Sequence, residues 1–359
     1  MNVLLSTTLF PGSLYYRMSE PARAVNDVGL GVEVTVQRGV KTTMARSSAD
    51  PDAPAAVQTV DAQGADVVVL QLPKTREMLD ALRLLQGRGV AVVVEMDDLL
   101  SAVPPGHRGH DVLVRKGVAR VAAACAREAD FVTVSTPALL EEYAPHGRGM
   151  VVPNAIPRRI AELTPAHDRA PEVVTVGWAG SVSTHPYDLE EMQSGLQQAL
   201  DRTGGVSRFA ILGEAGDARR RLRLAEDPIE LPWVHDVDGY LATLGQRFDI
   251  GLAPLRIDRF NTAKSWLKVL EYAARGIYAV RAPSAEYERL GLGHRAKRPR
   301  DWSAAIVKGV EDPDRRRDVA AADRELVLAS HLTEHTAELW VTAWRQAREN
   351  RSRADRIGA

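Results

Sequence analysis

The stretch "GVAVVVEMD" (89–97) and the earlier run "ADVVVLQL" (65–72) decide the fold. Both are continuous valine-rich runs, without the polar alternation of a strand that has one face in water. Such runs are typical of strands buried on both faces, as in a parallel sheet covered by helices. A helical pattern at 75–87 lies between them, so this part of the chain predicts a right-handed strand–helix–strand unit.

Further strand patterns extend this unit along the chain. In the first half, strands are predicted at 2–7, 31–37, 130–136 and 149–154; in the second half, they are predicted at 173–180, 207–213, 248–255 and 276–284. The stretch 158–172, rich in proline and charge, predicts an interdomain linker, and residues from 302 onward have a helical pattern. The predicted fold class is therefore α/β, with two doubly wound, Rossmann-like halves and a helical tail.

The composition limits the function classes. The 359 residues carry a formal net charge of −1, which gives no general attraction to nucleic acid or to an anionic membrane. The single cysteine, Cys125, excludes a disulfide framework and a cysteine zinc site, and a cytoplasmic location is expected. The N-terminus lacks a signal-peptide pattern, and no apolar run approaches the ~20 residues that cross a bilayer.

The stretch "FNTAKSWLKVLEYAARG" (260–276) predicts a helix whose start carries two cations. Lys264 and Lys268 lie one turn apart, with Glu271 behind them. Cations near a helix N-terminus oppose the helix dipole, which favours anions there. The pattern makes physical sense if a strongly negative ligand binds at the helix start. Phosphate is the usual ligand, because free backbone N–H groups point at it.

Small and polar residues directly follow several predicted strands. In open parallel sheets, ligands bind beyond the carboxyl ends of the strands, so these residues are candidates for binding or catalysis. They are Gly12 and Ser13 after the first strand, Asp97 and Asp98 after the run at 89–97, and Gly180, Ser181 and His185 after the strand at 173–180.

Five motifs, in a fixed order, give the sequence a resemblance to a known family. They are "VVPNAIP" (151–157), "VTVGWAGSVSTHPYDLE" (174–190), "RFAILGE" (208–214), "FDIGLAPL" (248–255) and "FNTAKSWLKVLEYAARGIYAV" (260–280). The chain resembles GT-B glycosyltransferases similar to family 4, in a divergent group with the pattern FNxxKSxLKxLEYxAxG and the motif GWAGS. The resemblance implies two Rossmann-like domains that face a cleft.

The resemblance also implies what each domain does. Residues 1–160 would form an N-terminal acceptor domain, and residues 161–332 a C-terminal domain that binds a nucleotide-sugar donor. The last helix, at about 333–359, would pack back on the N-terminal domain. The implied activity is hexosyltransferase-like. It moves a sugar from the donor to an acceptor hydroxyl, with retention at the anomeric carbon and without a metal or a cofactor.

Donor-binding roles follow from the resemblance, position by position. In the family, N–H groups at a helix start bind the diphosphate, a small-residue loop approaches it, and a glutamate binds the ribose. The matching positions are Ser265, Trp266 and Leu267 for the N–H groups, Gly180 and Ser181 for the loop, Glu271 for the ribose, and His185 for a further donor contact.

The sequence departs from the family pattern at two places. The family has two glutamates separated by seven residues, but Ala263 stands where the first is expected. The usual arginine and lysine of the loop after the strand at 173–180 are also missing. Lys264, and with it Lys268, is expected to supply the missing cation, and Lys264 would stabilise the leaving diphosphate during catalysis.

The acceptor side is expected in the first half of the chain. Asp97 or Asp98 would act as the base for the acceptor hydroxyl, and Gly12 and Ser13 would lie on the same side. The Asp pair is not interpreted as a metal site, because the family generally needs no metal. The stretches 42–57 and 104–117 are plausible acceptor loops.

Simpler interpretations stay open for several of these residues. Lys264 and Lys268 could be solvated surface, Glu271 could form a surface ion pair, Asp97 could cap a helix, and Trp178 and Trp266 could serve packing alone. The basic runs 219–223 and 294–300 leave weak peripheral membrane association open.

Two other functions stay open as well. The missing first glutamate fits a nucleotide-sugar-binding subunit without catalysis, and a GT-B sugar-nucleotide epimerase is a further alternative. The sequence names neither the sugar nor the base. The acceptor could be a saccharide, a lipid, a small molecule or a protein, and no nucleic-acid partner is expected.

Overall fold

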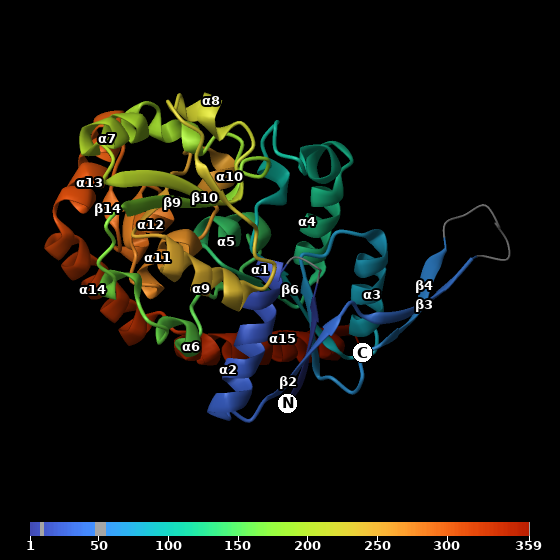
Figure 1. Ribbon diagram of the computed structural model, residues 1–359. Helices are drawn as coiled ribbons and strands as arrows, with labels where there is room; N and C mark the ends of the chain where they lie inside the picture. Colours follow the sequence, from blue (N-terminus) through green and yellow to red (C-terminus); the bar gives the residue numbers. More distant parts are fainter. Residues whose placement is uncertain (8–10, 47–54, 359) are drawn as a thin grey trace. The chain divides into compact units, whose positions relative to one another are not determined.

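The computed structural model describes residues 1–7, 11–46 and 55–358. The chain forms two compact units, each with its own parallel sheet (Figure 1). Unit 1 comprises Met1–Val103, Asp111–Asn154 and Thr333–Ala359, and unit 2 comprises Pro104–His110 and Ala155–Leu332. The boundaries expected from the sequence lay after residues 160 and 332.

Unit 1 has a six-stranded sheet in the order β2-β1-β5-β6-β7-β8, and all neighbouring strands are parallel. The strands are β1 (Asn2–Thr7), β2 (Glu33–Arg38), β5 (Val67–Gln71), β6 (Ala91–Met96), β7 (Phe131–Val134) and β8 (Gly149–Val151). Every residue of the valine-rich strands β5 and β6 is buried, which confirms them as central strands.

Helices of unit 1 begin where the sequence supplies a cap. Thr75 accepts a hydrogen bond from the Met78 N–H at the start of α3, and Thr136 accepts one from Leu139 at the start of α5. The helical segments are α1 (Pro11–Leu14), η1 (Tyr15–Ser19), α2 (Glu20–Val28), α3 (Arg76–Gln86), η2 (Leu100–Ala102), η3 (Asp111–Arg115), α4 (Val118–Glu128), α5 (Pro137–Tyr143), η6 (Thr333–Thr336) and α15 (Ala337–Gly358).

The C-terminal helix α15 belongs to unit 1 and completes its core. It packs against α2, β6 and β7. Its two tryptophans, Trp340 and Trp344, are buried in the same apolar cluster as Val67 and Val93 of the central strands. Because an aromatic side chain buries a large apolar area, these two residues anchor the helix to the sheet.

A buried ion pair ties the helical segment η1 to the sheet of unit 1. Arg17 Nε donates to Glu95 Oε1 over 2.6 Å, and Thr133 donates to the other carboxylate oxygen. Arg17 also donates to Asn154 Oδ1 and lies over the Trp340 ring. Burial raises the pKa of Glu95 against the opposing effect of Arg17. The polar partners therefore compensate for the one charged residue inside the valine-rich strand β6.

The stretch 42–57 is not a simple acceptor loop, because strand residues occupy both of its ends. β3 (Lys41–Ala45) and β4 (Ala56–Asp61) form a separate antiparallel pair, and residues 47–54 lie outside the described part of the chain. All residues of β3 are exposed. The sequence therefore offered no apolar alternation that could predict this strand.

Unit 2 has a six-stranded parallel sheet in the order β11-β10-β9-β12-β13-β14. The strands are β9 (Val174–Ser181), β10 (Ser207–Glu214), β11 (Ile229–Leu231), β12 (Ile250–Ala253), β13 (Tyr278–Arg281) and β14 (His294–Arg295). Numbered along the chain within this unit, the order is 3-2-1-4-5-6, which is the order of dinucleotide-binding Rossmann folds. The strand order reverses between β9 and β12, so a ligand site is expected at their carboxyl ends.

The helical segments of unit 2 differ from the prediction in two places. They are α6 (Arg158–Ala161), η4 (Ala166–Asp168), η5 (Leu189–Met192), α7 (Gly195–Thr203), α8 (Ala218–Leu222), α9 (Val237–Arg247), α10 (Arg259–Thr262), α11 (Leu267–Ala274), α12 (Ala285–Leu290), α13 (Pro299–Glu311) and α14 (Pro313–Ser330). The apolar stripe at 189–200 spans η5 and α7, because Gln193 adopts a left-handed conformation (φ 46°) between them. The stretch 260–276 likewise forms α10 and α11, not one helix.

The predicted linker at 158–172 is part of unit 2. It contains α6 and η4, and its backbone is held by the guanidinium of Arg275, the residue after α11. Arg275 Nη1 donates to the carbonyl of Ile160, and Nη2 donates to that of Thr164, both over 2.9 Å. This stretch, although rich in proline and charged residues, is therefore a packed and hydrogen-bonded segment of unit 2. The prediction of an interdomain linker was wrong.

Candidate functional site in unit 2

Two glycines shape the carboxyl ends of β9 and β10. Gly180 and Gly213 are neighbours across the two strands, with φ of 152° and 130°. A Cβ atom on Gly213 would lie 2.3 Å from the Gly180 carbonyl oxygen, so only glycine fits there. Beyond Gly180, the Ser181 hydroxyl hydrogen-bonds to Glu214 and Ser183. Both glycines are therefore required by tight packing at this edge, Gly180 against the Trp178 ring and Gly213 against Gly180 and Trp233.

Lys268 brings a positive charge to the same edge. It lies in the first turn of α11, and its Nζ donates to the Ala179 carbonyl, one residue before Gly180. The ammonium also lies 5.5 Å from the centroid of the fully buried Trp178 ring. Burial lowers the pKa of Lys268, while Glu271 and Asp188 counter that effect. Trp178 therefore fills the core and also contacts the Lys268 ammonium.

His185 and Asp188 form a hydrogen-bonded pair beyond β9. His185 Nδ1 lies 2.7 Å from Asp188 Oδ2, and Asp188 Oδ1 accepts from Asn261 Nδ2 and from the Arg256 N–H. Burial lowers the pKa of His185. Burial is the largest single influence on Asp188 and would raise its pKa, but His185, the Arg256 N–H and Lys264 together lower it. Asp188 thus joins three segments at this edge, a role the sequence did not predict.

Lys264 lies before the helix, not at its start. Asp258 caps the short helix α10 by accepting the Asn261 N–H over 2.8 Å, and α11 begins only at Leu267. Lys264 Nζ lies 4.6 Å from the centroid of the buried Phe260 ring. The predicted spacing of two lysines along one helix was therefore wrong, although both act electrostatically on His185.

The residues expected to offer N–H groups to phosphate stand at the start of α11. Trp266 directly precedes the helix, and the Leu267 N–H lies 3.4 Å from Ser265 Oγ. The Trp266 side chain is only 6% exposed and packs under the guanidinium of Arg289, 4.1 Å from its ring centroid. The Trp266 indole therefore serves packing, as the simpler interpretation expected. The Trp266 backbone lies at the start of α11.

Glu271 is buried inside unit 2. Its side chain is 6% exposed, and Oε2 accepts a hydrogen bond from the Tyr240 hydroxyl over 3.2 Å. A surface ion pair is therefore excluded for Glu271. A buried carboxylate held by a tyrosine, one turn after Lys268, is well placed to accept hydrogen bonds from a ligand at the edge.

Replacing Glu271 by glutamine is expected to weaken nucleotide binding by ~1.5–3 kcal/mol, because a charged hydrogen-bond acceptor is lost. Glutamine keeps the shape and can still accept from Tyr240, so the fold should persist. Calorimetric titration with UDP measures the change, and Glu311→Gln, at the exposed end of α13, is the matched control. Unchanged affinity in Glu271→Gln would refute the ribose-binding role.

Asp97 and Asp98 directly follow β6 at the carboxyl edge of the unit 1 sheet. The Tyr143 hydroxyl donates to the Asp98 carbonyl and accepts from the Leu100 N–H, both over 3.1 Å. The 3₁₀ turn η2 that follows begins after Leu99, whose side chain provides no cap. Tyr143 instead holds the backbone that presents both carboxylates.

Lys74, which the sequence did not single out, belongs to the same edge. It lies shortly after β5, and burial lowers its pKa while Asp97 and Asp98 act in the opposite direction. Both carboxylates therefore lie close enough to Lys74 to act on it electrostatically. A signal was available, since Lys74 follows a predicted buried strand just as the Asp pair does.

Gly12 and Ser13 lie in the short helix α1 after β1. Gln71, at the end of β5, donates to the Ser13 carbonyl over 2.8 Å and accepts from the Thr7 hydroxyl over 2.7 Å. Gly12 is exposed. The structure thus places both residues near the carboxyl ends of β1 and β5, where the strand order of unit 1 reverses.

Residues Pro104–His110 belong to unit 2, although unit 1 continues on both sides of them in the sequence. The Arg108 N–H donates to the Ser183 carbonyl over 3.1 Å, and the Tyr187 hydroxyl donates to the Pro105 carbonyl over 2.6 Å. The His107 ring lies 5.9 Å from that of Phe260. The predicted acceptor loop 104–117 is therefore divided, and its first part packs on the loop after β9.

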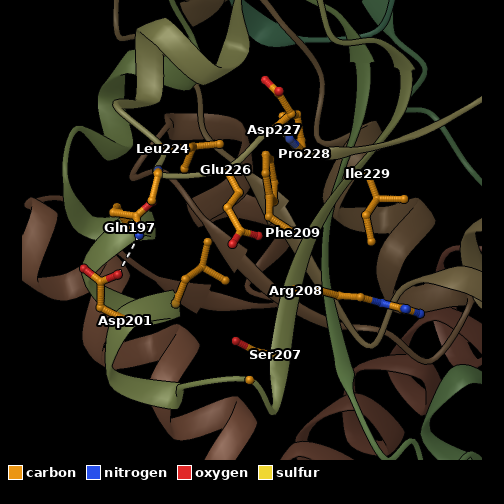
Figure 2. A pocket seen from close by; sticks show the side chains of 13 residues that line it. Gln197, Asp201, Ser207, Arg208, Phe209, Leu224, Glu226, Asp227, Pro228 and Ile229 are labelled. Carbon is orange, nitrogen blue, oxygen red and sulfur yellow. Dashed lines mark hydrogen bonds between the residues drawn. The ribbon is translucent and has the colours of Figure 1, made fainter.

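A surface cavity of about 350 Å³ in unit 2 lies elsewhere (Figure 2). Its floor includes Phe209 at the start of β10 and Ile229 of β11, and Gln197 donates to Asp201 at its rim. These positions belong to the opposite half of β10 from Gly213. The cavity therefore does not contain the residues that the sequence predicts for ligand binding.

The two basic runs are largely paired with nearby acids. Arg219 pairs with Asp227, and Arg220 and Arg221 pair with Asp217. In the run 294–300, Arg295 pairs with Glu288, and Arg298 and Arg300 pair with Asp301. Local pairing reduces the field that such runs offer to an anionic surface.

Within the described ranges, no group of three or more His, Cys, Asp or Glu side chains is arranged to hold a metal ion. None of the helices in these ranges combines the length and the apolar character needed to cross a membrane.

Comparisons with known proteins place this geometry in context. Residues 193–342 match a family described as "Glycosyl transferase-like". HepE of Anabaena, solved in complex with UDP and glucose, has a TM-score of 0.59 at 14% identity, covering 95% of this chain and 98% of HepE. A glycosyltransferase from Rickettsia africae has a TM-score of 0.61 at 10% identity, covering 96% and 98%. No curated protein matches the sequence.

A third solved structure is longer than this chain. TarM of S. aureus, in complex with Fondaparinux, alpha-GlcNAc-glycerol and UDP, has a TM-score of 0.57 at 13% identity. The match covers 77% of this chain and only 55% of TarM. Together, the two Rossmann-like units and the match over residues 193–342 confirm that the chain resembles GT-B glycosyltransferases and shares their fold.

Proposed function

We propose that the chain is a glycosyltransferase that moves a hexosyl group from a nucleotide-sugar donor to an acceptor hydroxyl. One observation carries the proposal. Lys268 holds its ammonium near the end of β9, on the Ala179 carbonyl next to Gly180 and Ser181, and Glu271 lies one turn behind it on α11. A cation and a buried carboxylate at the switch point of a Rossmann-like sheet suit a ligand with a diphosphate and a ribose.

The donor would bind along this edge. Its diphosphate would accept hydrogen bonds from backbone N–H groups of Ser265, Trp266 and Leu267 and would be neutralised by Lys264 and Lys268. The remaining contacts would come from Gly180, Ser181, His185 and Glu271. HepE and TarM support a nucleotide ligand, since both were solved with UDP.

In the proposed reaction, the acceptor oxygen bonds to the anomeric carbon while the bond from that carbon to the diphosphate oxygen breaks. The bond's electron pair leaves with the nucleoside diphosphate, where Lys264 stabilises the charge. Asp97 or Asp98 would take the acceptor proton, with Gly12 and Ser13 on the acceptor side. We infer retention, and chemistry without a metal or cofactor, from the family resemblance.

One observation favours a second candidate, a nucleotide-sugar-binding subunit without catalysis. Ala263 is buried where related sequences carry the first glutamate of their motif, so no carboxylate stands at that position. Such a subunit would bind the same donor at the same edge. The acceptor class stays open among saccharides, lipids, small molecules and proteins, and we propose a cytoplasmic location.

Thermal shift with a panel of nucleotide sugars, followed by donor turnover in the presence of EDTA, tests these proposals. A donor at 100 times its dissociation constant adds ~2.7 kcal/mol of stability. Release of nucleoside diphosphate and free or transferred sugar supports the transferase. Binding without turnover supports the binding subunit, turnover to an isomeric nucleotide sugar indicates an epimerase, and no stabilisation by any donor contradicts all three.

A further inference from the structure

Trp233 is the one tryptophan that water reaches readily. All six tryptophans lie in the described ranges, and Trp233 is 49% exposed whereas none of the others exceeds 6%. It stands two residues beyond the end of β11. A large aromatic group is thus left half in water at the carboxyl edge of the unit 2 sheet, where ligands of this fold bind.

The indole is held against the ends of neighbouring strands. A Cβ atom on Gly213 would lie 2.9 Å from Trp233 Cε3, so the glycine also makes room for the ring. Gly213 is paired with Gly180 of β9. Trp233 therefore lies beside the strand ends whose Ala179 carbonyl accepts from Lys268.

Trp233 connects to Glu271 through one residue. The ring centroids of Trp233 and Tyr240 are 5.9 Å apart with an interplanar angle of 31°, and the Tyr240 hydroxyl donates to Glu271. Lys268 precedes Glu271 by three positions on α11, so their side chains are neighbours on the helix. In this series of contacts the order is ammonium, carboxylate, tyrosine and exposed indole.

We propose that Trp233 is the platform on which the nucleobase of the donor stacks. The inference rests on the proposed function and deepens it. A nucleoside diphosphate presents phosphate, ribose and base in sequence, which matches the order Lys268, Glu271, Trp233. Every base has a π-face, so stacking adds affinity with little selection among bases. Trp233 would therefore strengthen the binding of all nucleoside diphosphates and leave base selection to other groups.

The test compares three folded variants with the wild type. Trp233→Ala removes the platform, and Trp233→Phe keeps an aromatic face. Val206→Ala shortens another half-exposed apolar side chain of unit 2, just before the start of β10. Calorimetry with UDP, GDP and ADP is expected to show affinity about 10-fold or more weaker in Trp233→Ala for each nucleotide that the wild type binds. Trp233→Phe and Val206→Ala are expected to stay close to the wild type.

Fluorescence gives an independent measure of the same contact. Acrylamide should quench mainly Trp233 in the free protein, because the other five indoles are buried. A bound nucleoside diphosphate is expected to reduce this quenching by covering the indole. The wild-type protein alone suffices for this measurement, so a folding defect in a variant cannot obscure it.

Each outcome has a distinct meaning. If the wild type binds a nucleotide but Trp233→Ala binds it equally well, the platform is refuted and the proposed function stands. Equal losses in Trp233→Ala and Trp233→Phe, or unchanged acrylamide quenching on nucleotide binding, also refute stacking. Failure of the wild type to bind any nucleotide or nucleotide sugar overturns the proposed function together with this inference.

Discussion

Replacing Asp97 or Asp98 by asparagine is expected to lower kcat about 100-fold or more at whichever position supplies the base. Asparagine keeps the size and most hydrogen bonds of aspartate but cannot accept a proton at neutral pH. Donor affinity should change little, because the predicted donor contacts lie on unit 2. The measurement is the rate of nucleoside diphosphate release at saturating donor, with calorimetric donor affinity alongside.

The backbone of Asp97 and Asp98 is anchored independently of their side chains, so a change in kcat can be assigned to the carboxylate. Asp97 and Asp98 follow a fully buried strand, and Tyr143 fixes their backbone through the Asp98 carbonyl. A side-chain substitution therefore leaves that anchor intact. Asp27→Asn, on the exposed face of α2, is the matched control for loss of one charge in unit 1. Wild-type kcat in both single variants would exclude either carboxylate as the base.

Burial pattern explains which strands could be predicted. β5 and β6 are apolar at nearly every position because both faces are covered, and such runs are evident in a sequence. β3 is wholly exposed, and β11 has only three residues, so neither shows a period that separates it from a loop. Local sequence pattern thus predicts the centre of each sheet better than its edges.

Positions in the candidate site could be predicted where a single helix or strand end carries the residue and its neighbours. Glu271 and Lys268 lie on α11, and the rule that ligands bind at the carboxyl ends of strands placed Gly180 and Ser181 beside them. The role of Asp188 was not predictable, because its partners come from three segments. The sequence did not single out Trp233, for a related reason. Its proposed role as a stacking platform is inferred from contacts with Tyr240 and Gly213, which lie on other elements.

Replacing Lys264 by methionine is expected to lower kcat/KM about 100-fold or more, equivalent to ~3 kcal/mol of lost transition-state stabilisation. Methionine keeps much of the stem over the Phe260 ring but removes the charge, so stability should change little. The reason for the effect is the charge that builds on the leaving diphosphate, which a nearby ammonium stabilises more in the transition state than in the ground state. Steady-state kinetics and thermal melting on the same preparation measure both quantities.

Lys268→Met provides the comparison that separates a transition-state role from a structural one. Lys268 donates to the Ala179 carbonyl, so its loss should lower stability as well as kcat/KM, whereas Lys264→Met should affect kinetics alone. Lys308→Met, on the exposed face of α13, controls for loss of a lysine charge in unit 2. If Lys264→Met keeps wild-type kcat/KM while Lys268→Met loses it, the phosphate cation is Lys268, the lysine that reaches β9. If both variants keep it, neither lysine acts on the diphosphate, and the charge that the family supplies from the loop after β9 must come from another residue.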